Sequence, residues 1–189
     1  MHYLDLIVRF LFFLPVWPLC LIGYYKNSEY VDADLQGIHV PKGGAHLILT
    51  LLQNKTFRNI FYYRIGELGN AIKLYMHEQE SLHIMTKKIG KGLIVVHGDS
   101  TFINAKEIGE RCYVNQNVTI GTVGNKTPTI GNNVRVATGA IVLGDITIGD
   151  NVVIAAGAVV VKSVPANCMV AGNPAHIRKM NGESVDIKL

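Results

Sequence analysis

The chain of 189 residues has little of what marks several common classes of protein. Only 17% of its residues are charged, its net charge is +4, and its Lys and Arg residues form no dense run. This distribution is not that of a nucleic-acid-binding protein, so we expect no nucleic acid partner. Cys20, Cys112 and Cys168 are too few and too widely spaced for a disulfide framework or a zinc motif. We therefore expect buried, reduced thiols in a cytoplasmic protein.

No apolar run has the length of an ordinary membrane-spanning helix. The segment FLFFLPVWPLCLIGYY, residues 10–25, carries no charge but is shorter than the roughly 20 residues that a span needs. Pro15 and Pro18 would kink or break a helix there, and no signal-peptide cleavage pattern follows.

Three interpretations of this segment stay open. It forms a helix pair packed on the protein's own core or on a subunit interface, it lies on the inner face of the membrane through residues 3–25, or it spans the bilayer. In the second case four residues would sit at headgroup level: Trp17, Tyr24, Tyr25 and Lys26.

Helical spacing of apolar residues continues through residues 28–80. Leu47, Leu51 and Leu52 share one helical stripe, and Gly43-Gly44 and Asn54-Lys55 are expected breaks. We expect residues 1–82 to form an apolar, helical N-terminal region.

A six-residue period replaces the helical spacing from about residue 83. Its first register contains only Ile and Val: Ile108, Val114, Ile120, Ile130, Val136, Val142, Ile148, Ile154 and Val160. Its second register contains small, thiol or aliphatic residues: Cys112, Val118, Val134, Ala140, Ile146, Val152, Ala158 and Val164. Gly, Asn, Asp and Thr fall between the two registers, as turn residues do.

A period of six fits neither a single strand nor a helix, whose periods are 2 and 3.6. It predicts short strands joined by corners, with one aliphatic side chain of each strand pointing inward and three strands in each coil. Stacked coils would pair their strands in parallel. We predict a mainly β protein: a parallel β-helix of about five coils over residues 83–175, preceded by the helical region and followed by a C-terminal tail, 176–189.

Three segments of the repeat resemble the left-handed β-helix, or hexapeptide-repeat, acyltransferases in their serine acetyltransferase branch. These segments are IGKGLIVVHG at 89–98, NQNVTIG at 115–121 and VPANCMVAGNPAHIRK at 164–179. The resemblance implies a left-handed coil and a homotrimer. It also implies an acetyl-CoA donor bound between neighbouring copies and direct acetylation of a hydroxyl group.

The resemblance also assigns roles to single residues. His97 matches the family's general base, a role that suits an imidazole at neutral pH. The remaining matches are expected to contact the cofactor or the thioester oxyanion: Gly121, Thr122, Thr138, Gly139, Ala140, Ala156, Gly157, Lys162, Arg178 and Lys179.

Several positions depart from the branch. The aspartate that orients the base is matched by Leu82, or by Ser81 if the register slips by one, and neither is acidic. The nearby Glu80 or a backbone carbonyl is then expected to orient His97 instead. Three acceptor-site positions carry Val96, Lys126 and Thr127, where the branch has an acid, an arginine and a histidine.

This loss of charge disfavours a zwitterion such as free serine. The apolar N-terminal region and FRNIFYYRIG at 57–66 resemble those of capsule and exopolysaccharide O-acetyltransferases. We therefore expect a saccharide acceptor, free or carried on a lipid.

Two other functions stay as alternatives. The first is a serine O-acetyltransferase of cysteine biosynthesis, and the second is a non-catalytic trimeric scaffold. A zinc site is not expected, because the histidines of the repeat region, His83, His97 and His176, are too scattered to converge.

Overall fold

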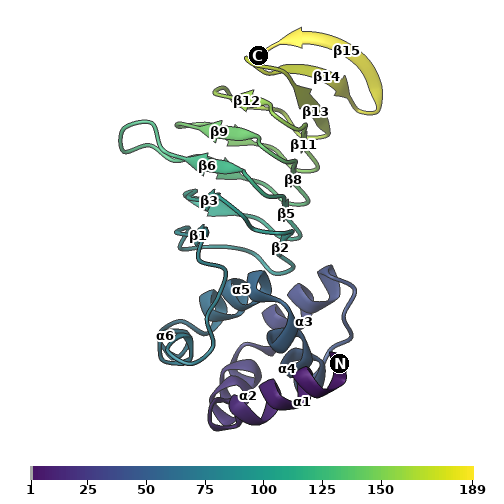
Figure 1. Ribbon diagram of the computed structural model, residues 1–189. Helices are drawn as coiled ribbons and strands as arrows, with labels where there is room; N and C mark the ends of the chain where they lie inside the picture. The colour runs from purple at the N-terminus through teal and green to yellow at the C-terminus, as the bar shows by residue number, and fades with distance from the viewer. Residues whose placement is uncertain (1) are drawn as a thin grey trace. The chain divides into compact units, whose positions relative to one another are not determined.

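The structure, a computed structural model, describes residues 2–189, with side chains described from Leu4 onward. It contains two compact units, one helical and ending at Glu80, the other a β-helix from Ser81 to Leu189 (Figure 1). The two units are treated separately below.

The helical unit contains six α-helices and one 3-10 turn among the described residues. Gly44 begins one helix, and the side chain of Asn54 accepts a hydrogen bond from the Phe57 N–H to cap the next, so both expected breaks are confirmed. The elements are α1 (His2–Phe12), η1 (Leu14–Val16), α2 (Trp17–Lys26), α3 (Ser28–Gly37), α4 (Gly44–Gln53), α5 (Lys55–Ile65) and α6 (Glu67–Lys73).

The apolar segment 10–25 contributes to the core of this unit in part. Trp17 and Tyr24 are buried, with 5% and 6% of their surface exposed, and Trp17 Nε1 donates a hydrogen bond to the Phe10 carbonyl. Neither ring is therefore available at headgroup level, in contrast to Tyr25 and Lys26, which are exposed. Among the described residues no single helix has the length and composition of a membrane span. α1 and α2, from Leu4 to Lys26, meet those criteria only as a pair that bends by 53°.

Helix α5 holds the chain that follows α6 through buried polar side chains. The Arg58 guanidinium donates to the Leu51 and Leu52 carbonyls in the last turn of α4 and to the carbonyl of His77. Asn59 exchanges two hydrogen bonds with the backbone of Gln79. Burial lowers the pKa of Arg58, which nevertheless stays charged because an arginine pKa starts so high.

The β-helix passes through three parallel sheets in each coil (Figure 1). The first sheet contains β1 (Leu82–Ile84), β3 (Thr101–Ile103), β6 (Thr119–Gly121), β9 (Ile141–Leu143) and β12 (Val159–Val160). The second contains β4 (Glu107–Ile108), β7 (Thr129–Ile130) and β10 (Thr147–Ile148). The third contains β2 (Ile94–Val95), β5 (Tyr113–Val114), β8 (Arg135–Val136), β11 (Val153–Ile154), β13 (Cys168–Ala171), β14 (His176–Met180) and β15 (Glu183–Lys188). We call them sheets A, B and C.

Both registers of the repeat point into the β-helix. All residues of the first are buried, as Ile148, Ile154 and Val160 illustrate, and so are all residues of the second, with Ile146 the most exposed at 8%. Each six-residue repeat therefore buries two side chains, where the sequence predicted one.

One corner of the coil, between sheets B and C, is built from residues with left-handed backbone. Asn133, Asn151 and Asn167 have φ of 54°, 58° and 58° there, which asparagine tolerates better than most residues. Their side-chain amides form a ladder: Asn133 donates to Asn151 at 3.1 Å, and Asn151 donates to Asn167 at 2.8 Å. The ladder ties three successive coils together at this corner.

The last residues continue sheet C rather than leaving it. Strand β14 pairs antiparallel with β13, and β15 pairs antiparallel with β14. Residues 176–189, expected as a tail, thus form a hairpin that extends the sheet.

Candidate active site

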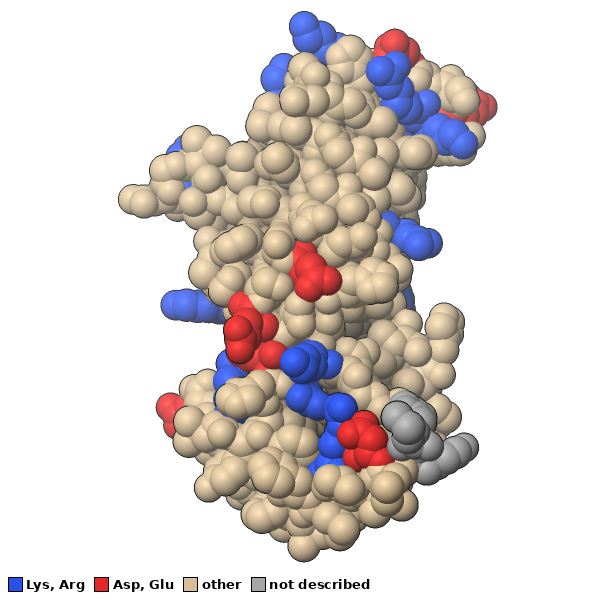
Figure 2. All heavy atoms as spheres, in the orientation of Figure 1, with Lys and Arg blue, Asp and Glu red and all other residues tan. Residues whose placement is uncertain are grey.

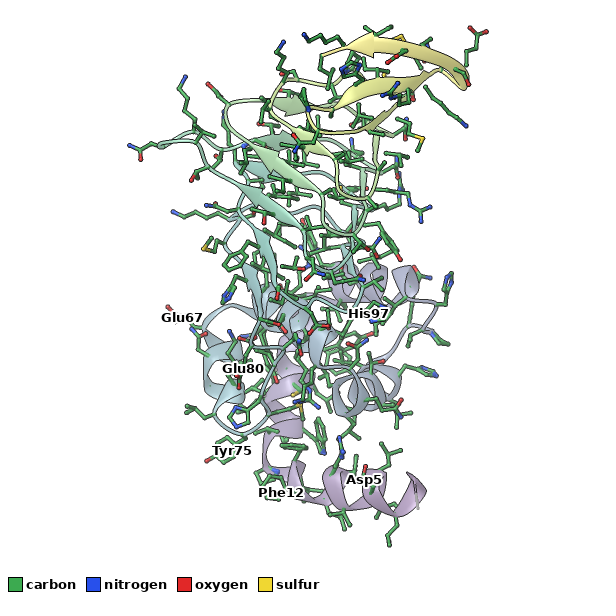
Figure 3. All side chains as sticks on the ribbon, turned by 45° about the horizontal axis from the view of Figure 1, so that its top comes forward. Asp5, Phe12, Glu67, Tyr75, Glu80 and His97 are labelled. Atoms are coloured by element: carbon green, nitrogen blue, oxygen red, sulfur yellow. The ribbon has the colours of Figure 1, made fainter. Side chains whose placement is uncertain are left out.

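His97 lies at the corner between sheets C and A in the first coil (Figure 3). Val95 pairs with Val114 and Ile103 pairs with Ile120, so this corner spans 103 − 95 = 8 positions, whereas the next spans 120 − 114 = 6. The His97 corner therefore has two residues more than the corner stacked on it. The extra length lies within residues 96–102, and the side chains of His97, Asp99 and Ser100 are exposed there.

The backbone at His97 is left-handed. Its φ is 64°, and the Gly98 N–H donates to the Val96 carbonyl at 2.8 Å, which closes a three-residue turn with His97 at its centre. A turn of this kind is rare and strained for a residue with a side chain. Such strain is concentrated at functional sites, where the fold holds a side chain in an otherwise unfavourable place.

Small residues occupy the same edge of the β-helix in the coils that follow. Gly139 and Gly157 occupy corresponding corners with φ of 69° and 67°, and the Gly157 N–H donates to the Thr138 carbonyl at 3.0 Å. A Cβ added at Gly157 would meet nothing within 4 Å. The structure thus brings four expected cofactor residues onto the His97 edge: Thr138, Gly139, Ala156 and Gly157. Ala140 is fully buried and points into the β-helix, so its expected contact with the cofactor is corrected here.

Other expected site residues lie at the opposite edge of sheet A, where the chain turns toward sheet B. Gly121 ends β6, and an exposed loop follows in which Val123 and Lys126 pair across a turn with Gly124 at φ 61°. Lys126 forms an ion pair with Asp145 at 3.2 Å. Four expected residues belong to this edge in addition to Gly121: Thr122, Lys126, Thr127 and Lys162. Within one copy, sheet A separates them from the His97 edge.

The remaining expected cations lie on the C-terminal hairpin. Arg178 forms an ion pair with Asp186 at 2.8 Å, and Asp186 also contacts His176 Nδ1 at 3.1 Å. Lys and Arg side chains gather at this end of the β-helix, while much of its face in view carries no charge (Figure 2). A pocket of about 120 Å³ beside the hairpin is lined by Lys162, Lys188 and apolar residues. Lys162 donates to the Leu189 carbonyl at 2.6 Å, and Lys179 is exposed.

Glu80 is exposed at the end of the helical unit. Its role in positioning His97 stays a prediction. Leu82, at the position of the family's orienting aspartate, is buried in β1. Among the described residues, no group of three His, Cys, Asp or Glu side chains is arranged to hold a metal ion.

The three outer faces of the β-helix differ in polarity. On sheet B the outward residues of the paired strands are Glu107, Thr129 and Thr147. Lys88 and Ser163, exposed beside the bridged Ile89 and Val164, continue this row, so all five residues are polar. On sheet A they are His83, Phe102, Thr119, Ile141 and Val159, and on sheet C they are Ile94, Tyr113, Arg135, Val153 and Met169. The two faces that flank the His97 edge are thus the more apolar ones.

Comparison with known proteins assigns this architecture to a family. Residues 127–162 match the model of the bacterial transferase hexapeptide, six repeats. A serine acetyltransferase of Synechococcus elongatus is 41% identical over 104 residues, which are 52% of this chain and 43% of that protein. The solved serine acetyltransferase of Neisseria gonorrhoeae in complex with serine is 30% identical, with a TM-score of 0.66, over 82% of this chain and 70% of that one.

The chain belongs to the serine acetyltransferase-like branch of the hexapeptide-repeat acyltransferases. The predicted fold, a left-handed β-helix of about five coils that follows N-terminal helices in the sequence, is thereby confirmed. A serine acetyltransferase solved in complex with CoA is also similar, with 25% identity and a TM-score of 0.64 over 85% of this chain and 74% of that one. The chain spans 43% of the length of the Synechococcus relative.

The expected saccharide acceptor is not supported and is corrected here. The relatives and solved structures compared above are serine acetyltransferases, which favours the alternative acceptor, serine. The saccharide was expected from the lost charges at Val96, Lys126 and Thr127 and from the likeness of the N-terminal region and residues 57–66 to polysaccharide O-acetyltransferases. Charges for a zwitterion can come from neighbouring positions, and Asp99 places a carboxylate on the same corner as His97. Asp99 was not among the residues expected from the sequence, although the corner at residues 96–102 is two residues longer than the corner stacked on it.

Proposed function

We propose that the protein is an acetyl-CoA-dependent serine O-acetyltransferase with His97 as its general base. The observation that carries this proposal is the exposed imidazole of His97, held on a strained turn at the edge where small residues leave room along the coils. The likeness to serine acetyltransferases solved with serine and with CoA supports the acceptor and the donor.

The reaction needs a base and a place for negative charge. His97 removes the proton of the serine hydroxyl as its oxygen attacks the thioester carbonyl, which forms a tetrahedral oxyanion. The C–S bond then breaks, the acetyl group stays on serine, and the thiolate of CoA takes up the proton. General-base help of this kind contributes typically 10²- to 10⁴-fold to the rate. Backbone N–H groups at Gly121 and Thr122 are the candidates to stabilise the oxyanion.

The positions of the candidate residues favour a homotrimer. The His97 edge and the Gly121 edge lie on opposite sides of sheet A, so one copy does not bring them together. A neighbouring copy is therefore proposed to bring its exposed loop to the His97 edge, and the apolar outer faces of sheets A and C are candidates for the contact between copies. Sheet B, with its polar outer face, would stay in solvent.

The acceptor's charges suggest two further roles. The carboxylate of Asp99, exposed on the His97 corner, is a candidate to pair with the ammonium group of serine. Lys126, on the exposed loop, is a candidate partner for the serine carboxylate from the neighbouring copy. The cations Lys162, Arg178 and Lys179 remain candidates for the phosphates of the cofactor.

A thiol-release assay with acetyl-CoA tests the proposal. The acceptors are L-serine, D-serine, L-threonine, serine methyl ester and a blank, and mass spectrometry identifies the product. We expect rapid CoA release and O-acetylserine with L-serine, and at least tenfold slower release with the ester, which lacks the carboxylate. Asp99→Asn is expected to raise the KM for serine more than it lowers kcat. Release that no amino acid stimulates would refute the acceptor, and the absence of CoA binding would favour a non-catalytic scaffold.

A further inference from the structure

Helix α1 exposes an unusual amount of apolar surface. Leu4, Ile7, Val8, Leu11 and Phe12 are each exposed over more than half of their surface, from 56% to 72%. Phe10 is exposed over 39%, and Leu14, in the turn that follows, over 53%. Isolated apolar side chains on a surface need no explanation, but a contiguous group of this size marks a binding surface.

The exposed side chains cover a wide arc of the helix. At 100° per residue, the positions from Phe10 through Ile7, Leu11, Leu4 and Val8 to Phe12 span about 200° of α1. Leu6 and Phe13 point the other way and pack against the core of the helical unit. Asp5 and Arg9 lie at one margin of the arc and form an ion pair with each other at 3.0 Å, so the surface has no net charge of its own. Figure 3 labels Asp5 and Phe12 on this helix.

The width of this arc indicates what covers it. A helix that packs on one protein partner buries an apolar stripe of about 100°. Acyl chains can surround an arc of any width, and a helix that lies in the membrane interface buries its apolar face among them. α1 is too short to cross a bilayer, and the chain bends by 53° between α1 and α2, which suits a helix lying in the plane of the membrane. α2 adds the exposed side chains of Ile22 at 48% and Tyr25 at 71%.

We propose that α1, with the exposed end of α2, is an interfacial anchor that docks the protein on a lipid bilayer. Insertion is driven by the apolar arc rather than by charge, because Asp5 and Arg9 neutralise each other at its margin. Arg9 and Lys26 are both exposed, and long basic side chains of this kind can extend from an apolar surface to the headgroups. The anchor is independent of the proposed acetyl transfer, because it uses no residue assigned to that reaction.

The full chain offers its own probe for this contact. Trp17 is the single tryptophan of the sequence, and its ring stacks on Phe10 of α1 with centroids 5.8 Å apart. Vesicles with bromine on the acyl chains quench tryptophan fluorescence at short range. We expect quenching of Trp17 by vesicles of brominated phosphatidylcholine, and equal quenching when 30 mol% phosphatidylglycerol is included.

Vesicle sedimentation with two double variants completes the test. Ile7→Gln with Leu11→Gln keeps good helix formers but removes the centre of the arc. Leu74→Gln with Tyr75→Gln is the matched control, because these side chains belong to the same unit and are exposed over 77% and 60%. We expect the partition coefficient to fall at least tenfold for the first pair and to change less than about twofold for the control. Serine-dependent CoA release is expected to be unchanged in both.

Two results would overturn the anchor. One is wild-type protein that neither sediments with vesicles nor shows quenching. The other is an Ile7/Leu11 double variant that binds vesicles as the wild type does. Light scattering of the lipid-free protein tests whether a second copy of the chain covers the arc instead. If the wild type does not bind vesicles and the Ile7/Leu11 double variant has a lower assembly mass than the wild type, the arc is a contact between copies.

Discussion

Replacing Arg58 by methionine is expected to destabilise the helical unit by about 3–4 kcal/mol. Arg58 is buried, with 5% of its surface exposed. Its guanidinium donates to the Leu51 and Leu52 carbonyls at the end of α4 and to the carbonyl of His77. Methionine keeps most of the apolar volume but donates no hydrogen bond. A buried carbonyl without a donor costs roughly 1–3 kcal/mol, so the two in α4 alone account for most of the effect.

Urea unfolding followed by ellipticity at 222 nm measures this change, because all six α-helices of the described chain lie in this unit. With a slope of about 1–3 kcal/mol per molar urea, the midpoint should fall by about 1–4 M. The urea midpoint of Arg58→Lys should lie between those of the wild type and Arg58→Met, because a single ammonium group cannot donate to three separate carbonyls as the guanidinium does. Arg9→Met is the control, because Arg9 makes an exposed pair within α1 and should contribute less than about 1 kcal/mol. A loss below 1 kcal/mol in Arg58→Met would refute the reasoning.

Two further predictions concern the β-helix corners and the cysteines. Asn151→Ala should be less stable than Asn151→Gly by about 1 kcal/mol in thermal unfolding. Both variants lose the amide ladder, but only alanine is strained at φ 58°. Equal stability of the two variants would mean that the left-handed backbone of this corner does not affect stability. Burial raises the pKa of Cys20 to about 12 and that of Cys112 to about 11, so both thiols stay protonated at pH 8. A thiol reagent at pH 8 should leave both unmodified in the native protein and label them in urea, whereas native labelling at the rate of a free thiol would contradict their burial.

The strict repeat made most of the β-helix predictable. Every position of both registers, from Ile108 to Val164, faces the interior, because a six-residue period leaves each side chain in the same place on successive coils. The hand of the coil did not follow from the spacing and entered through resemblance. The first coil was less predictable, since its longer corner at residues 96–102 interrupts the period that would have revealed it.

The site was predictable in its residues but not in its assembly. His97 and Gly157 proved to lie on one edge, and Gly121 and Lys162 on another, which depends on which corner of the coil each residue occupies. Likewise, the aromatic residues of the N-terminal segment were expected together at a surface, but the helices turn Trp17 and Tyr24 inward and leave Tyr25 outside. The apolar composition of this segment predicts that its side chains avoid water. Only the packing of the helices determines whether a given side chain is buried in the core or exposed at the surface.

The general-base role of His97 is tested most directly by comparing turnover with cofactor binding in His97→Ala. The account predicts that kcat for serine acetylation falls by about 10²- to 10⁴-fold while the Kd for CoA, measured by calorimetry, changes less than about threefold. His97→Asn, which keeps a hydrogen-bonding side chain but no base, should be equally impaired. Turnover at the wild-type rate in either variant would contradict the account.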